Sequence, residues 1–98
     1  MITHIAIYKF KEGTVAKEID LALSEVKSLK DKVRGLVDIL AGKNYNKWNE
    51  GFTYAIVVLA ENQEALDAYR AHPDHAKIAE ILDKMEDKGI GIDFEDME

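Results

Sequence analysis

The sequence predicts an α+β fold with the element order strand, helix, strand, strand, helix, strand. Two observations lead to this prediction. Side chains alternate between two faces, with the period of two that a strand requires, near both ends of the chain and in its middle. Between these segments apolar residues recur every three or four positions, as they do on the buried side of a helix. The chain has 98 residues, which suits one domain, placed at residues 1–98.

The first strand is expected over residues 2–10, where both faces are largely apolar. One face carries Ile2, His4, Ala6, Tyr8 and Phe10, and the other carries Thr3, Ile5, Ile7 and Lys9. A turn with Gly13 follows, and Thr14 is a candidate N-cap for a long amphipathic helix. The apolar positions of this helix continue to Val33, and Gly35 is its expected end.

Two strands are expected in the middle of the chain. The second strand follows Gly35 and ends raggedly within residues 42–46. The third strand, over residues 52–60, is rich in aromatic and β-branched residues and is apolar on both faces. Because both of its faces call for burial, we place the third strand in the centre of the sheet.

A helical region in two pieces comes next. Asn62 can cap a short helix, which the His72-Pro73 step interrupts because proline suits the first turn of a helix and restricts the residue before it. The second piece carries an apolar stripe from His75 to Met85, and this stripe is expected to face the sheet.

The chain ends on a strand. Gly89 and Gly91 are expected to bracket the last turn, before a final strand whose apolar side holds Ile90, Ile92 and Phe94. With this strand the order becomes the ferredoxin-like split βαβ arrangement (βαββαβ). Such a subunit has a four-stranded antiparallel sheet with its helices packed on one face.

The other face of this sheet needs a cover. It would carry Ile5, Ile7, Ala55, Val57 and Leu59. Leaving about five aliphatic side chains exposed forfeits roughly 1.5 to 3 kcal/mol each, which is comparable with the whole stability of a small domain. A second identical chain is the simplest cover, so we predict a homodimer through the open sheet face.

Composition argues against several classes of partner and compartment. The net charge of -6 opposes a phosphate backbone, and no stripe of Lys and Arg appears, so no nucleic-acid binding is expected. The longest apolar run, residues 55–60, is far shorter than the roughly 20 residues of a membrane span. The N-terminus lacks the pattern of a signal peptide, and cysteine is absent. We therefore expect a cytoplasmic protein with no membrane partner.

Three histidines lie on or near apolar faces, and imidazole is the side chain most easily tuned for proton transfer near neutral pH. His4 shares its strand face with Tyr8, His75 lies on the helix stripe, and Tyr69 is the last large residue before the helix break. We therefore predict that His4, Tyr69 and His75 converge between sheet and helices. The alternative, that the histidines only pack and form buried hydrogen bonds, stays open.

Further residues could line a pocket at this place. Tyr8 and Tyr54 are on the sheet face that meets the helices, and we add His72 as a third ligand-binding candidate. A metal site is a competing interpretation, because His72 and His75 are three apart and His4 could supply a further ligand. No Cys, Asp or Glu obviously completes a tetrahedron, so we predict neither a metal nor any other cofactor.

Four segments resemble a known family, the stress-responsive dimeric α/β barrel or Dabb domain. They are HIAIYKFK at residues 4–11, GKN at 42–44, GFTY at 51–54 and, most specifically, YRAHPDH at 69–75. The resemblance spans nearly the whole chain. It implies ferredoxin-like subunits whose two sheets close face to face into a dimeric α/β barrel.

The resemblance also implies a chemistry. One plant member of the family is a cyclase that closes a linear polyketide by aldol condensation without a cofactor. Transferred by motif, its residues make His75 a general base that removes a proton next to a carbonyl, while Tyr69 and His4 orient groups and stabilise the enolate.

Two functions are consistent with these residues. The first is a Dabb protein that binds a small organic ligand in a pocket between sheet and helices. The second is a cofactor-independent cyclase or isomerase that acts on a small carbonyl or polyketide-like compound. The observation that separates both from a purely structural role is whether His4, Tyr69 and His75 border a cavity that solvent can enter.

Overall fold

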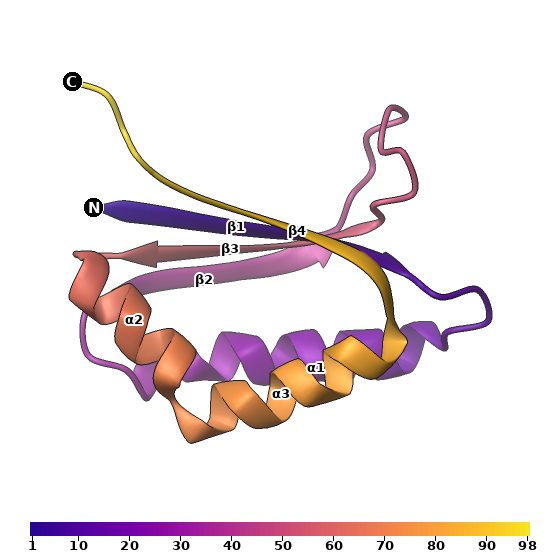
Figure 1. Ribbon diagram of the computed structural model, residues 1–98, viewed down its shortest axis with the longest axis horizontal. Helices are drawn as coiled ribbons and strands as arrows, with labels where there is room; N and C mark the ends of the chain where they lie inside the picture. The colour runs from indigo at the N-terminus through magenta and orange to yellow at the C-terminus, as the bar shows by residue number, and fades with distance from the viewer.

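A computed structural model describes residues 1–98 and has the predicted ferredoxin-like α+β fold. The strands are β1 (Ile2–Phe10), β2 (Leu36–Lys43), β3 (Tyr54–Ala60) and β4 (Glu86–Glu95). The helices are α1 (Ala16–Ser28), the 3-10 turn η1 (Leu29–Asp31), α2 (Gln63–Ala71) and α3 (Pro73–Met85). All pairs of neighbouring strands are antiparallel, in the order β2-β3-β1-β4. The helices cover one face of this sheet (Figure 1).

The core lies between that face and the helices. Along β3 every second residue, from Tyr54 to Ala60, is buried beneath the helices, and the residues between them are only half-buried. Strand β3 has a neighbour on each side, as its two apolar faces predicted. On the helix side, Val58 of β3 and Leu66 of α2 are fully buried within one continuous apolar cluster. The period-two pattern therefore sorts each strand into a core side and an open side.

The first helix is shorter than predicted, and Thr14 does not cap it. The Thr14 hydroxyl donates a hydrogen bond to the Lys11 carbonyl at 2.6 Å, which closes the preceding turn instead. Helix α1 then gives way to η1 before Val33. The chain turns at Gly35, which has φ +90° and where a Cβ would lie 2.7 Å from the Ala65 Cβ. This close approach to α2 requires glycine.

The helix break forms as predicted. The Asn62 side chain accepts a hydrogen bond from the Ala65 amide at 2.9 Å and so caps α2. His72 ends α2 in an extended conformation, and its Nδ1 accepts from the Asp74 amide at 3.0 Å. His72 is therefore the N-cap of α3, and Pro73 occupies the first turn of that helix.

Two strand boundaries differ from the prediction. Gly89 and Gly91 lie within β4 rather than at a turn, because α3 passes directly into β4 at Glu86. The Lys11 amide donates to the Met85 carbonyl at 2.8 Å and ties this junction to the end of β1. Phe52 is buried, but it precedes β3, which begins two residues later.

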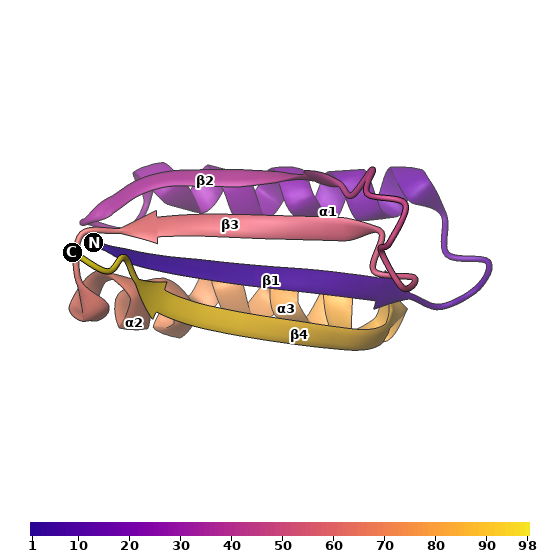
Figure 2. The ribbon, with the colours of Figure 1, turned by 90° about the horizontal axis from the view of Figure 1, so that it is seen from above.

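The opposite sheet face is apolar and uncovered in the single chain. Figure 2 looks onto this face, with the helices behind the sheet. Ile5 pairs with Ile92, and Ile7 pairs with Ile90, across the β1–β4 ladder. Ile92 keeps 50% of its surface exposed, and Leu40 on β2 keeps 51%. The predicted open face therefore exists and extends over all four strands. No helix combines the length and the apolar character needed to cross a membrane.

Candidate functional site

A cavity of about 420 Å³ lies on the helix side of the sheet, where β1 and β4 pass α3. Its lining residues are His4, Ala6, Tyr8, Arg70, His75, Glu86, Gly89, Ile90 and Gly91. A smaller recess of about 60 Å³ adjoins it, since Tyr8 and His75 line both, and Tyr69 lines the recess. We call the larger space the site cavity.

The strand register explains why space remains there. Tyr8 pairs with Gly89, and Ala6 pairs with Gly91, so the helix side of β4 carries no side chain at two successive inward positions. Helix α3 therefore cannot close onto this part of the sheet with side-chain contacts. The site cavity is the space that the two glycines leave open.

His4 is held by an acid from β4. In the register His4 faces Asp93, and its Nδ1 lies 2.6 Å from Asp93 Oδ1. A carboxylate oxygen only accepts, so the hydrogen of this contact is on Nδ1. Arg70 from the last turn of α2 donates to both oxygens of Asp93, at 2.9 and 2.7 Å. These bonds to Arg70 hold the pKa of Asp93 below its usual value.

The rings of Tyr69 and His75 meet edge to face, with their centroids 4.7 Å apart. The His4 ring lies 6.4 Å from the Tyr69 ring. The structure thus brings together the three residues that we predicted to converge. Tyr69 is only 3% exposed, and burial, with a smaller contribution from Tyr8, raises its pKa to about 12. Its phenol is a neutral hydrogen-bond donor at neutral pH.

His75 is also neutral at neutral pH. Burial is the main cause that lowers its pKa, and the positive charges of His4, Arg70 and His72 add to the effect. A neutral imidazole beside a cavity can accept a proton. The neighbouring Tyr8 has a raised pKa, first because it is buried and then because Glu86 and Asp83 are close.

Two of the predicted pocket residues lie elsewhere. Tyr54 is buried on the helix side of β3, edge-on to Phe10 at 5.5 Å, and does not line the site cavity. His72 uses its Nδ1 to cap α3 and also lies outside the lining. No group of three or more His, Cys, Asp or Glu side chains is arranged to hold a metal ion.

Sequence reasoning missed Asp93, Arg70 and Glu86. One pattern could have pointed to the acid. Asp93 shares its strand face with Gly89 and Gly91, so it is the first side chain beyond two positions without one. A lone carboxylate on the helix side of a sheet needs a partner. Arg70 lies in the most specific motif of the family resemblance, but its partner depends on the strand register.

The fold and the site cavity together define a ferredoxin-like subunit with an open recess beneath its helices. The chain matches the family model of the stress responsive A/B barrel domain (Dabb) over residues 2–96. It belongs to this family, as the sequence resemblance predicted. The stress-response A/B barrel domain-containing protein At5g22580 of Arabidopsis thaliana is 29% identical over 91 residues, which cover 93% of this chain and 82% of that protein.

Solved structures share the fold at low sequence identity. The Arabidopsis thaliana protein At3g17210 superposes with a TM-score of 0.88 at 24% identity, over 100% of this chain and 97% of that one. A dimeric ferredoxin-like protein of unknown function from Jannaschia sp. CCS1 gives 0.86 at 22% identity, over 96% and 97%. The hydroxynitrile lyase of Passiflora edulis gives 0.84 at 15% identity, over 95% and 90%. The fold therefore occurs both in an enzyme and in proteins without a known function.

Proposed function

We propose that the chain binds a small organic molecule in the site cavity. The observation that supports this proposal is the open space over Gly89 and Gly91, directly beside two imidazoles. Its volume is within the range of about 300 to 1,000 Å³ that is usual for ligand pockets. The His4 imidazole and the Tyr8 phenol are polar groups on the lining of this space. A flat apolar molecule with a carbonyl or hydroxyl group fits these features.

The test fills the space without removing a polar group. Gly91 has ordinary backbone angles, and the atom nearest to an added Cβ would be His4 Cε1 at 4.0 Å, so Gly91→Val fits the strand and occupies the site cavity. Gly42→Val is the matched control, because Gly42 is on β2 with open space around it. The probes are small aromatic ketones and phenols, and the measurement is the dissociation constant by ligand-observed NMR.

We expect at least one probe to bind the wild type and Gly42→Val with equal affinity. The same probe should bind Gly91→Val at least about tenfold more weakly, since the valine side chain blocks its contacts in the pocket. Equal binding to all three proteins would place the ligand elsewhere and would contradict the proposal.

A second function is favoured by the protonation state of His75. A neutral imidazole next to a neutral phenol can remove a proton from the carbon beside a carbonyl. In this step the C–H bond breaks, the proton goes to His75, and the electron pair moves onto the carbonyl oxygen. This oxygen would have to enter the adjoining recess, where Tyr69 can donate a hydrogen bond to it. This is the first step of a cofactor-independent isomerase or cyclase.

Isotope exchange tests this step before any product is known. Aromatic ketones that bind the site cavity are incubated in heavy water with the wild type, His75→Gln and His72→Asn. We expect deuterium to enter the carbon next to the carbonyl with the wild type and with His72→Asn, but not with His75→Gln. Exchange at the solvent rate in all three samples would exclude proton abstraction and leave ligand binding in place.

We further infer that the open sheet face forms a homodimer. The exposed isoleucines of β4 and Leu40 of β2 extend the apolar face beyond the five residues expected from the sequence. The ferredoxin-like protein from Jannaschia is dimeric, which supports self-association here. The two sheets would then enclose an apolar layer, while each site cavity stays on the outer, helix side of its own subunit.

A further inference from the structure

A second apolar surface lies on the outer side of the helix layer, between α1 and α3. This helix groove has a volume of about 380 Å³. Its lining residues are Glu18, Leu21, Ala22, Glu25, Ile81, Lys84 and Met85. Leu21 is 58% exposed, and Ile81 is 45% exposed. The open sheet face and the site cavity do not account for these exposed side chains.

We propose that the helix groove binds the helix groove of a second copy of this chain. The reason is the order of charges along its two walls. The α1 wall carries Glu18, Leu21 and Glu25, and the α3 wall carries Ile81 and Lys84. Lys77 lies one helical turn before Ile81, in the hollow that continues the groove. Each helix thus has one exposed apolar side chain between two charges that are seven residues, or about two helical turns, apart. The α1 wall is acidic and the α3 wall is basic.

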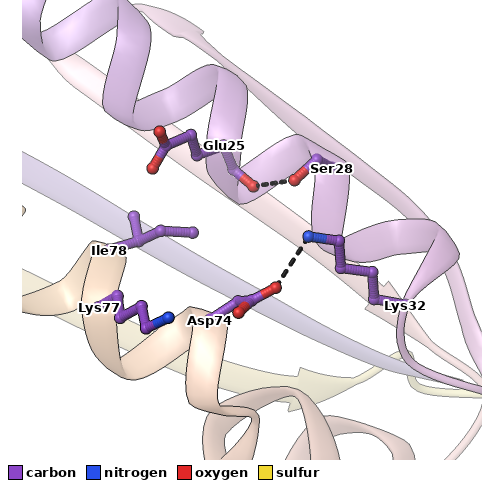
Figure 3. Close-up of a pocket in the computed structure, with 6 residues that line it drawn as sticks. All are labelled: Glu25, Ser28, Lys32, Asp74, Lys77 and Ile78. Carbon is purple, nitrogen blue, oxygen red and sulfur yellow. Dashed lines mark hydrogen bonds and ion pairs between the residues drawn. The ribbon is translucent and has the colours of Figure 1, made fainter.

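The walls are in register with each other. Helices α1 and α3 run in opposite directions (Figure 1), so Glu18 lies near Lys84 at one end. At the other end Glu25 and Lys77 line one hollow, which Figure 3 shows together with the Lys32–Asp74 ion pair of 2.8 Å.

These charges are available to another molecule. Glu18, Glu25 and Lys77 form no ion pair within the chain. The only ion pair of the Lys84 ammonium is with Glu80, at 3.9 Å on the exposed side of its own helix. Such an exposed pair contributes little, so it does not prevent Lys84 from binding elsewhere.

Symmetry then selects one way for two copies to pack. A two-fold axis parallel to the helices places α1 of one copy over α3 of the other. Glu18 then meets Lys84 of the second copy, and Leu21 meets its Ile81. At the far end Glu25 meets Lys77 in the same way. An axis perpendicular to the helices would instead stack α1 on α1 and oppose two acidic rows, which is unfavourable.

This contact is independent of the sheet interface. The helix layer and the open sheet face are on opposite sides of the molecule (Figure 1), so one chain can use both at once. Assemblies of more than two chains follow, and salt should dissociate them first at the helix groove, because that contact relies on exposed charges.

Charge exchange tests the proposal without touching the core. One variant carries Glu18→Lys and Glu25→Lys, a second carries Lys77→Glu and Lys84→Glu, and a third carries all four changes. The third variant has the same net charge as the wild type and serves as the matched control. The measurement is the weight-average mass by sedimentation over a wide concentration range at low salt, with thermal unfolding as the check on folding.

The weight-average mass of the wild type should rise above the mass of its smallest species as the protein concentration increases. Each two-site variant should associate about tenfold or more weakly, because like charges then face each other across the two-fold axis. The four-site variant, and an equimolar mixture of the two-site variants, should associate like the wild type. Salt at about 1 M, where the Debye length is about 3 Å, should weaken association in every case.

A wild-type mass that does not change with concentration would overturn the proposal. The proposal would also be overturned if the mass of the two-site variants rose with concentration as that of the wild type does, since another surface would then cause the association. A four-site variant that fails to associate while the wild type does would contradict the pairing of α1 with α3.

Discussion

Burial acts on His75 and Tyr69 in the same direction, since it favours the neutral form of each ring. Their edge-to-face contact follows from the chain break at His72-Pro73, which lets α2 end with Tyr69 and α3 begin with His75 in its first turn. The Tyr69 ring is thereby buried, and the His75 ring is partly buried at the edge of the open site cavity. A neutral base and a neutral donor are thus placed side by side.

The lowered pKa of His75 predicts how stability depends on pH. Between the ordinary imidazole pKa of about 6.5 and the lower value of the folded state, the unfolded chain binds the proton more readily. The contribution of His75 to the free energy of unfolding should therefore be complete above pH 6.5, and the free energy of unfolding should fall as the pH drops below that value. His75→Gln should lose part of this dependence. Urea unfolding of both proteins at several pH values measures the difference, and parallel curves would contradict it.

Asp93 should set the tautomer of His4. In the wild type the carboxylate holds the proton on Nδ1. Asp93→Ala removes the acceptor, so the proton should move toward Nε2, the form that free imidazole prefers. Nitrogen chemical shifts of histidine-labelled protein report the tautomer. Asp87→Ala, which removes the same charge elsewhere on β4, should leave it unchanged; the same spectrum in all three proteins would show that Asp93 does not hold the ring.

The three residues that converge could be predicted because helix and strand periodicity assign each of them to a face. The residues around them could not. Asp93 and His4 are 89 residues apart in the sequence and meet only because β1 and β4 pair. Arg70 in turn binds that acid from the exposed end of α2. Strand register and side-chain reach are tertiary properties, and no local pattern encodes them.

At the scale of elements, the chain follows its local patterns except where a competing contact is stronger. The Asn62 cap and the His72-Pro73 break could be predicted directly from the sequence. Thr14 does not cap the helix because its hydroxyl donates its hydrogen bond to the Lys11 carbonyl instead. The two glycines of β4 suggest a turn by composition, yet pairing with β1 on one side keeps them extended. Because these glycines have no side chains, β4 leaves room for the site cavity.

The cap on α3 makes a prediction about His72. His72→Ala removes the acceptor for the Asp74 amide and should lower the free energy of unfolding by about 0.5 to 2 kcal/mol. His72→Asn supplies another good capping oxygen and should stay close to the wild type. Urea denaturation measures both. Equal losses in the two variants would show that His72 stabilises the fold through packing instead.

At the scale of the molecule, the helices cover one face of the sheet and leave the other apolar. This division could be predicted from the alternation in β1 and β3 alone. The contribution of β4 could not, because its apolar residues were assigned to a strand whose neighbour was unknown. Pairing with β1 adds Ile90, Ile92 and Phe94 to the open face.

The dimer proposal is tested on this face. Ile92 is half exposed in the single chain, so Ile92→Asp should fold and should lower the mass at low micromolar concentration from twice 11.1 kDa to 11.1 kDa. Ile81→Asp, on the helix layer, is the control and should remain dimeric there. A wild type that sediments as a folded monomer would contradict the sheet interface.

The proposed function depends on a ligand in the site cavity, and the three histidines of the chain report on such a ligand directly. His4 and His75 line the site cavity, whereas His72 caps α3 outside it. The decisive measurement is a titration of histidine-labelled protein with a bound aromatic ketone or phenol, followed by NMR. We predict that the ring signals of His4 and His75 shift together with one dissociation constant while that of His72 stays in place. Saturable binding that leaves His4 and His75 unshifted would contradict the account.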